Sequence, residues 1–352
     1  ELARELEVII QEANRKLDSR DAVAGETLYE LLFERHRMRR WRIGTEQGLR
    51  KLTHEDVRAY YQTRYTPGRV VVAIVGDVDT EHALNLARTA YSDWDRPTVA
   101  VEGSPPEPDT IVPSVRLLTG DVKRPLAVIG WKTVGTLHED TPALDVAAAV
   151  LGNGRGSRLY RRVRTPGLAS SVRAGHYTPT EVGVFDISLA ADADRLDEAV
   201  TCCVDTVSEL LETAPIEREL DRTRALFATR WARVFESMDS RAAALAEGES
   251  LGGYQLIDEL HQRALDVTAE QVQRVVSRYL RSEHASLVVY LPEDGHTSLA
   301  AGSWPLPPRK QSSPVGPVRD ALIESTRDNP AEIVDSAEYP GGISLRSYEG
   351  VD

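Results

Sequence analysis

Apolar residues recur along this chain at two spacings, and each spacing predicts a different element. Intervals of three and four residues are typical of one face of a helix. They predict helices near residues 2–17, 26–35 and 53–64, and at Pro142–Leu151, Ser157–Val163, Leu196–Leu211, Ile216–Leu251 and Ala269–Leu280. Short runs rich in β-branched residues predict strands at Arg69–Val75, Val115–Leu118, Leu126–Trp131, Ala169–His176, Val182–Leu189, Leu287–Leu291 and Gly341–Glu349.

Two segments resemble each other. One is LTHEDVRAYYQTRYTPGRVVVAIVGD, residues 52–77, and the other is VTAEQVQRVVSRYLRSEHASLVVYLPED, residues 267–294. Each predicts a helix capped by a threonine (Thr53 or Thr268), with an acid two residues after the cap and an Arg-Tyr pair near the helix end. A short turn and a β-branched strand follow in both. This repetition predicts a duplicated domain whose first copy lacks its beginning.

The grouping of strands and helices predicts an α+β fold, in which duplicated sandwich domains each carry an antiparallel or mixed sheet covered by helices. The first copy is expected to be incomplete at its N-terminus, because a sheet of one or two strands cannot bury its face. The predicted organisation is 1–95 for the end of the first domain, 96–113 for a Pro-rich linker, 114–294 for the second domain, 295–340 for another Pro-rich linker and 341–352 for the start of a further domain.

Length and charge narrow the classes of function. The 352 residues suffice for about two domains, and 42 basic against 55 acidic residues argue against nucleic acid or an anionic membrane as the main partner. No apolar run approaches the length of a membrane span. The adjacent Cys202 and Cys203 fit small core residues that form no disulfide. We expect a soluble protein of the bacterial cytoplasm or periplasm, although the sequence does not identify the compartment.

The ends of the sequence suggest a piece of a longer protein. The first methionine is Met38, and the chain starts inside a helical pattern that has no capping residue before it. The sequence is therefore compatible with a secretory signal peptide upstream of Glu1.

Several motifs have plain structural interpretations. The Gly-rich stretch LGNGRGSRLY, residues 151–160, lacks the Lys-Ser/Thr of a P-loop and follows a helix, so a tight turn is favoured over a phosphate site. The arginines of SRLYRRVRTPG, residues 157–167, are typical of a solvated helix face with one or two ion pairs. The eight histidines occur singly and none forms H-E-x-x-H or H-x-x-E-H, so the chain holds no complete zinc motif, and no G-x-S-x-G supports a serine nucleophile.

Glu5 and Glu12 raise a sharper question. At about 100° per residue they lie two turns apart, almost one above the other, at one edge of the apolar face of the first helix. A carboxylate there needs an arginine, a hydrogen-bond donor or a metal as partner. The pattern alone favours two glutamates that extend into solvent beside basic residues.

Several long stretches resemble the insulinase/pitrilysin family of zinc peptidases, the inverzincins. They are ELARELEVIIQEANRKLD, LYELLFERHRMRRWRIGTEQGLRKLTHEDVRAYYQTRYTPGRVVVAIVGDVD, LGNGRGSRLYRRVRTPGLASSVRAG and VGVFDISLAADADRLDEAV, in family order over residues 1–295. In that family an upstream H-x-x-E-H supplies two histidine ligands and the general base, and a later E-x6-E supplies the third ligand. The resemblance implies that Glu12 binds zinc and that Glu5 is a supporting carboxylate beside the site.

The resemblance also implies a reaction. Zinc with three protein ligands keeps one position for water, which a glutamate base deprotonates for attack on a peptide carbonyl. Because the H-x-x-E-H segment is absent, this chain alone is expected to bind Zn²⁺ weakly and to be inactive, and the intact protein is expected to be a zinc metalloendopeptidase.

A family segment like GLAYS, with an Arg and a Tyr that hold substrate, is here RTPGLASS: Arg164 is displaced and Ser170 stands in place of the Tyr. This departure fits the zinc-bearing half of an enzyme that closes two halves around a peptide. The expected partners are a peptide substrate, bound by strand addition, and a second half or homologous subunit.

The alternative is a non-catalytic scaffold or partner subunit of the same family. Retention of both Glu5 and Glu12 speaks against that alternative. Nothing favours a carbohydrate- or nucleotide-binding module.

Overall fold

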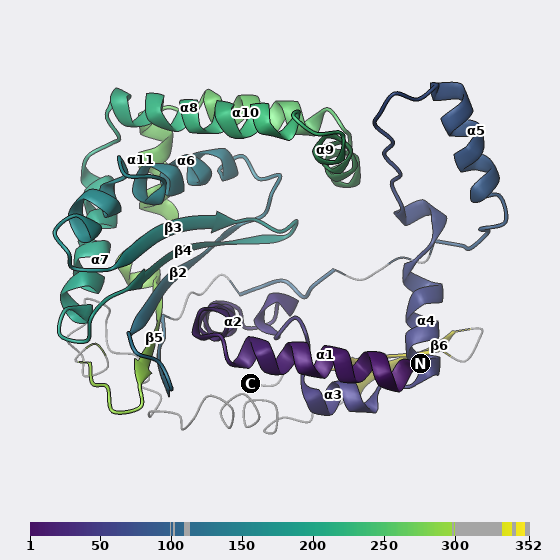
Figure 1. The fold of residues 1–352 in the computed structure, drawn as a ribbon, viewed down its shortest axis with the longest axis horizontal. Helices are drawn as coiled ribbons and strands as arrows, with labels where there is room; N and C mark the ends of the chain where they lie inside the picture. The colour runs from purple at the N-terminus through teal and green to yellow at the C-terminus, as the bar shows by residue number, and fades with distance from the viewer. Residues whose placement is uncertain are drawn as a thin grey trace.

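The computed structural model describes residues 1–98, 100, 103–108, 113–297, 299, 333–339 and 343–348, the last two ranges by their backbone. Figure 1 shows the arrangement of its elements. The α-helices are α1 (Leu2–Leu17), α2 (Arg20–Leu32), α3 (Glu46–Lys51), α4 (His54–Arg64), α5 (Thr80–Ala90), α6 (Thr141–Gly152), α7 (Leu196–Glu212), α8 (Glu217–Val234), α9 (Met238–Leu251), α10 (Leu256–Leu265) and α11 (Ala269–Tyr279). The strands are β1 (Val115–Gly120), β2 (Leu126–Val134), β3 (Ser171–Tyr177), β4 (Val182–Ala190), β5 (Ser286–Pro292), β6 (Ile333–Tyr339) and β7 (Ile343–Tyr348).

Five strands form the main sheet, in the order β1-β5-β2-β4-β3. Strands β1 and β5 are parallel, and the other pairs are antiparallel. Strand β5 lies between β1 and β2 although it comes last of the five in sequence, so the sheet is complete only when the chain returns from α11. The prediction of an α+β domain with a mixed sheet is confirmed for residues 115–292.

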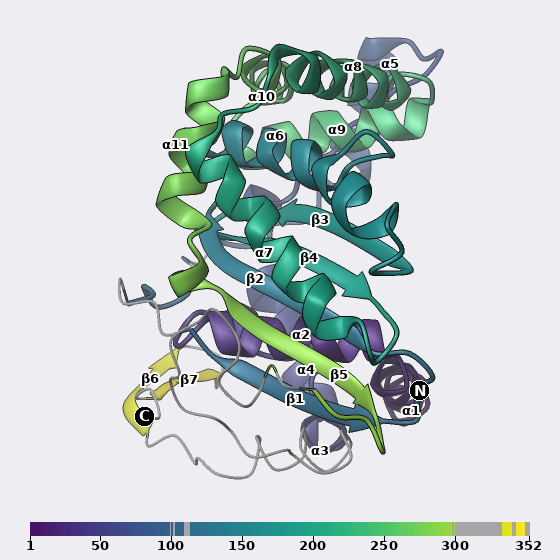
Figure 2. The same ribbon diagram turned by 90° about the vertical axis from the view of Figure 1, so that its left-hand side faces the viewer.

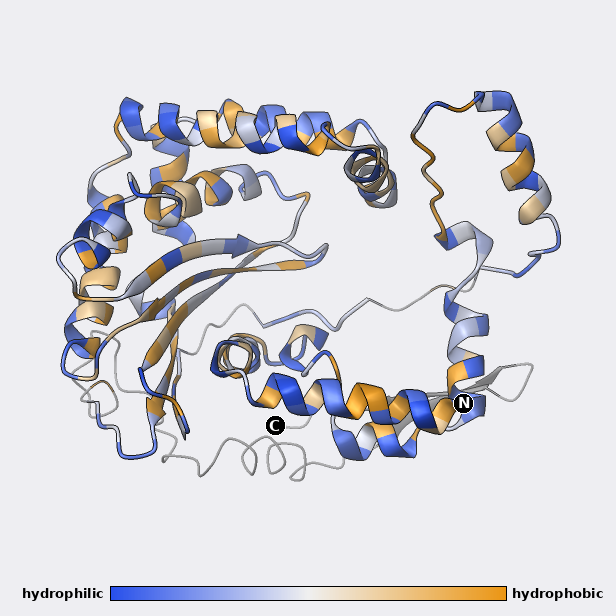
Figure 3. Cartoon of the chain, in the orientation of Figure 1, coloured by the Kyte–Doolittle hydropathy of each residue, from blue (hydrophilic) through white to orange (hydrophobic). Residues whose placement is uncertain are grey.

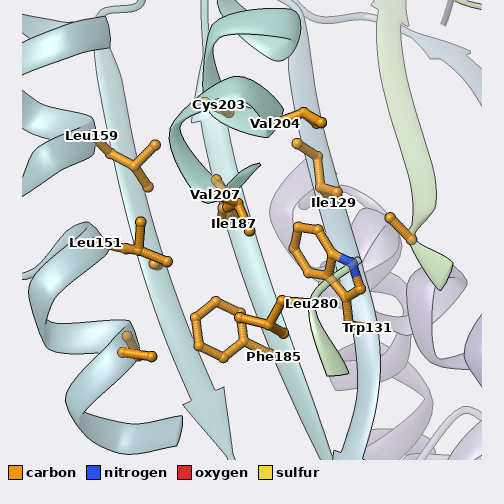
Figure 4. Packing of buried hydrophobic residues seen from close by; sticks show 14 of the residues in the cluster. Ile129, Trp131, Leu151, Leu159, Phe185, Ile187, Cys203, Val204, Val207 and Leu280 are labelled. Atoms are coloured by element: carbon orange, nitrogen blue, oxygen red, sulfur yellow. The ribbon is translucent and has the colours of Figure 1, made fainter. Parts of the chain in front are cut away.

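The main core lies between this sheet and helices α6, α7 and α11. Alternate residues of β2 and β4 point to it, with Trp131 and Phe185 edge to face at a centroid distance of 6.1 Å (Figure 4). The indole Nε1 of Trp131 donates to the carbonyl of Arg281 at 2.9 Å, which satisfies the polar edge of this buried ring. Cys203 is fully buried in the same core, as predicted.

The opposite face of the sheet is covered by α2, from the N-terminal part of the chain (Figure 2). Ala24 and Leu28 of α2 are buried against Val128 and Val288 of the sheet. A Cβ at Gly130 would lie 2.5 Å from Leu28, so the strand carries glycine where the helix crosses it. The two parts of the chain therefore share a core.

The run from Val70 to Val75 was predicted as a strand, and this prediction is wrong for the described structure. The residues follow the 3₁₀ turn Pro67–Arg69 in an irregular path, and none pairs with a strand among the described residues. Val72 and Ile74 are both 51% exposed. Figure 3 colours this run as strongly hydrophobic between α4 and α5. A strand is stable only beside neighbouring strands, and residues 1–98 form no other strand with which this run could pair.

The single predicted helix at Ile216–Leu251 is also wrong, because α8 and α9 are separate. Figure 1 draws α8 lengthwise and α9 almost end-on. Ser237 adopts an extended conformation and its side chain accepts from the amide of Ser240, which starts a new helix. Helices α3, α5 and α10, and strand β6 inside the range predicted as a linker, were not predicted; β7 coincides with the strand predicted at Gly341–Glu349.

Two of the smaller predictions are confirmed. The Gly-rich stretch is a turn, in which Gly154 has a φ of +78° and the Ser157 hydroxyl donates to its carbonyl. The arginine cluster makes ion pairs: Arg158 binds the buried Glu219 through two hydrogen bonds of 2.9 and 2.7 Å, and Arg162 pairs with Glu209. Within the described residues, the helices are too short or too polar to cross a membrane.

Candidate functional site

Helix α1 presents Glu5 and Glu12 to solvent. The helix buries Ile10 and Ala13, while both glutamates are exposed. Glu12 has a side chain 56% exposed and a loose ion pair of 3.8 Å with Lys16. The Glu5 carboxylate has no hydrogen bond or ion pair within the described part of the chain. The plain interpretation of two solvated glutamates therefore fits this geometry in part, and neither carboxylate has a structural contact to keep it in place.

These residues do not form a zinc site by themselves. No group of three His, Cys, Asp or Glu side chains is placed to hold a metal within the described ranges. A zinc ion in an enzyme is held by three protein ligands, and α1 offers one plausible carboxylate, Glu12, with Glu5 two turns away.

A second polar cluster was not predicted from the sequence. On the face of the sheet covered by α2, the phenol of Tyr29 lies within electrostatic reach of Glu26, Arg42 and Asp186. The side chain of Glu26 is only 9% exposed; its Oε1 accepts from Arg42 at 3.3 Å, and its Oε2 has no partner. Burial raises the pKa of Tyr29, and the Asp186 carboxylate raises it further.

Asp186 lies in the middle of β4 between two glycines, Gly130 on β2 and Gly175 on β3. A Cβ at Gly175 would lie 3.1 Å from its Oδ1, so the carboxyl leans over the glycine of the edge strand. Burial raises the pKa of Asp186, which Arg173 and His176 only partly counter. In both Glu26 and Asp186, the nearby positive charges only partly compensate the burial of the carboxylate. The sequence feature that could have indicated this cluster, and was not used, is the acid at the centre of the apolar stretch VGVFDISLA.

A Thr–His–Asp chain also occurs, but its burial points to a structural role. His176 Nδ1 is 2.8 Å from Asp145 Oδ1, and its Nε2 is 3.0 Å from Thr133 Oγ1. The His176 side chain is 1% exposed, so no substrate reaches the threonine oxygen. The chain instead links α6 to β2 and β3.

The segment that departs from the family pattern is now placed. Arg164 is exposed at the end of a π-helical turn, Tyr160–Arg164, in which the amide of Thr165 donates to the carbonyl of Tyr160. Ser170 is exposed, and its hydroxyl donates to the carbonyl of Ala190 at 2.9 Å, next to the start of β3. The two residues lie at opposite ends of one loop and share no contact within the described residues.

The sequence model described as "Peptidase M16 inactive domain" matches residues 51–227, about half of the chain. The chain belongs to the peptidase M16 family. This is the insulinase/pitrilysin family, so the resemblance drawn from the sequence is confirmed.

The curated M16 relatives include proteins named as zinc proteases. An uncharacterized zinc protease of Mycobacterium leprae is 25% identical over 291 residues, which cover 81% of this chain and 65% of that protein. One of Mycobacterium tuberculosis is 27% identical over 302 residues, covering 84% and 68%. A probable mitochondrial-processing peptidase subunit beta of Arabidopsis thaliana is 25% identical and covers 79% and 54%. The chain thus spans about two thirds of the length of the bacterial relatives.

Solved M16 structures share the fold. A peptidase M16 inactive domain from Pseudomonas fluorescens superposes with a TM-score of 0.74 at 21% identity, over 84% of this chain and 71% of that one. A protease from Helicobacter pylori gives 0.73 at 20% identity, over 82% and 71%. Identities this low establish the α+β fold and carry no inference about activity.

Proposed function

We propose that this chain is part of the zinc-bearing half of an M16 endopeptidase, in which Glu12 is a zinc ligand and Glu5 supports it. The observation that carries the proposal is the Glu5–Glu12 pair: two carboxylates on one line of α1, both exposed and neither held by a firm structural contact. Bound zinc would polarise the scissile carbonyl and lower the pKa of its water. Glu12 would be the third protein ligand, and the two histidines and the base would come from outside these 352 residues.

The repeated elements support an incomplete first domain. Helices α4 and α11 both start with a capping box, at Thr53 and Thr268, and each is 11 residues long. The buried residues of α11 are Val272, Val275 and Val276; the residues at the same positions of α4 are Val57, Tyr60 and Tyr61, which are 45%, 61% and 48% exposed. Side chains that pack in the second copy are thus uncovered in the first, which is what a domain without the rest of its sheet would show.

The substrate class follows from the same proposal. A peptide or unfolded segment would lie beside α2, near Glu26 of that helix and Asp186 of β4, with the free edge of β3 next to it. A second half of the same protein, or a homologous subunit, would close over it. The relative named as a processing-peptidase subunit supports such pairing.

Replacing Glu12 by glutamine in the full-length protein tests the zinc role. We expect bound zinc, measured by elemental mass spectrometry, to fall at least about tenfold, because a neutral amide is a poor zinc ligand. Peptide hydrolysis should fall with it. Glu7→Gln is the matched control, since Glu7 lies on another face of α1 and pairs with Arg50 at 3.4 Å. Unchanged zinc content in Glu12→Gln would contradict the proposal.

The alternative is a non-catalytic partner subunit, which the description of the matched domain as inactive favours. The same measurement separates the two. A full-length protein that carries no zinc and hydrolyses no peptide, yet binds a homologous chain, would establish the alternative.

A further inference from the structure

The segment 103–108, in the linker between the two parts of the chain, is anchored at its C-terminal end by a carboxylate. The side chain of Glu107 is 9% exposed and accepts from three consecutive backbone amides that follow α2: those of Glu34 at 3.0 Å, Arg35 at 2.6 Å and His36. Three amides that converge on one carboxylate form an anion-binding nest. The Nζ of Lys132 on β2 lies 3.8 Å from the same carboxylate and donates to the carbonyl of Pro108 at 3.0 Å.

A second carboxylate anchors the other end of this segment. Glu181, just before β4, accepts from the amide of Ser104 at 3.4 Å, from Arg37 at 3.4 Å and from His36 Nε2 at 2.8 Å. The His36 ring is 5% exposed, and its Nδ1 accepts from the amide of Met38. This bond assigns the proton to Nε2, so His36 donates to Glu181.

Both carboxylates are held in their charged form. The hydrogen bond from His36 lowers the pKa of Glu181 against the effect of burial, and Arg37 lowers it further. Burial acts to raise the pKa of Glu107, but the three amides and Lys132 more than offset it and lower the pKa. The contacts are thus charge-assisted and directional.

We propose that residues 103–108 act as a strap that fixes the angle between the N-terminal helices and the second-domain sheet. The strap joins the end of α2, strand β2 and the start of β4. Apolar packing of α2 on the sheet is non-directional and tolerates sliding, whereas hydrogen bonds to Glu107 and Glu181 set one orientation. The two parts would then move as one rigid body. This inference does not depend on zinc or on proteolysis.

The strap is tested by distances in the full-length protein. Spin labels at Gln11 on α1 and Arg230 on α8, both exposed, report the angle, with Cys202→Ser to avoid a competing thiol. We expect one narrow distance distribution in the parent and a distribution at least twice as wide in Glu107→Ala with Glu181→Ala. Glu34→Gln is the control, because the Glu34 side chain is exposed and, among the residues that the structure describes, pairs only with its neighbour Arg35. An unchanged distribution in the double variant would overturn the proposal.

Hydrogen exchange gives an independent measurement. In Glu107→Ala, the amides of residues 34–36 should exchange about tenfold faster, because each loses a bond to a charged group. Amides of β2 and α6 should keep their rates, which shows that the domain stays folded. Equal exchange at residues 34–36 in the variant and the parent would also overturn the strap.

Discussion

At the scale of single residues, Glu26 and Asp186 are largely buried carboxylates with few positively charged groups around them. Asp140 shows the usual arrangement: its buried carboxylate accepts from Arg274, Arg278 and the hydroxyl of Tyr279 at 2.7, 3.1 and 2.8 Å. Glu26 has one arginine, itself 67% exposed, and an oxygen without a partner. Polar atoms of buried carboxylates normally have hydrogen-bond partners, so Glu26 Oε2 could accept a hydrogen bond from a cationic ligand.

If the proposed peptidase binds peptides along this face, Glu26 should favour basic side chains. In the full-length enzyme, Glu26→Gln should lower kcat/KM for a peptide with an arginine near the scissile bond by about tenfold or more relative to a matched neutral peptide, since a charge-assisted hydrogen bond contributes about 1.5–3 kcal/mol. Asp192→Asn, an exposed acid paired with Arg124 at 2.9 Å, serves as control. An equal loss on both peptides would assign Glu26 to stability instead.

Glu219 predicts how stability responds to acid. Burial acts to raise its pKa, but the two hydrogen bonds and the charge of Arg158 outweigh burial and lower the pKa below the ordinary 4.5. A carboxylate with a lowered folded-state pKa stabilises fully above its unfolded value, and this contribution is lost as the pH falls below about 4.5. We expect Glu219→Gln to lower the free energy of unfolding by about 2–4 kcal/mol at pH 7. The gap in Tm between variant and parent should narrow from pH 5 to pH 3, and a constant gap would contradict this.

At the scale of elements, the sequence correctly predicted the helices and strands that are specified by local hydrophobic pattern and capping residues. All five strands of the main sheet and helices α1, α4, α6, α7 and α11 lie at or within a few residues of their predicted positions, because alternation and capping residues specify them locally. The break between α8 and α9 was missed, since both flanks are good helix formers and only the conformation of Ser237 separates them. The strand predicted at residues 70–75 was wrong for the opposite reason. Its residues strongly prefer the extended conformation, but a strand also needs pairing partners, which are distant in sequence.

Under the proposed duplication, helices α2 and α9 would occupy equivalent positions in the two copies. Both begin with Ser-x-Asp and a serine cap, at Ser19 and Ser237. Ala24, Thr27 and Leu28 of α2 are buried on the sheet; the residues at the same positions of α9 are only half-buried, and they are Ala242, Leu245 and Ala246.

If the domain is duplicated, α9 should cover the sheet of the first copy in the full-length protein. Amides of α9 should then exchange at least about tenfold more slowly in that protein than in the 352-residue chain. Leu245→Glu should remove the protection, and Glu247→Lys, at an exposed position of the same helix, should keep it. Equal exchange of α9 in the two chains would count against the duplication.

At the scale of the whole molecule, the sequence did not reveal how the two parts share a core. The sequence divided the chain at residues 96–113, but α2 from the first part fills one face of the second-domain sheet, and Glu107 of the linker binds the end of α2. Neither contact has a local signature, because each joins residues more than 70 positions apart. The same distinction holds for the candidate site residues. Glu5 and Glu12 were found from their spacing within one helix, whereas Glu26 and Asp186 come near Tyr29 only through tertiary packing.

The exposed run VVVAIV, residues 70–75, also affects the tendency of this chain to aggregate in solution. Six consecutive uncharged residues, mostly β-branched and with Val72 and Ile74 half exposed, have the composition of segments that stack into intermolecular cross-β ribbons. Arg69 and Asp77 flank the run and place charges that slow such stacking. The 352-residue chain should therefore aggregate more as its concentration rises, and strands supplied by a complete first domain would prevent this by pairing with the segment.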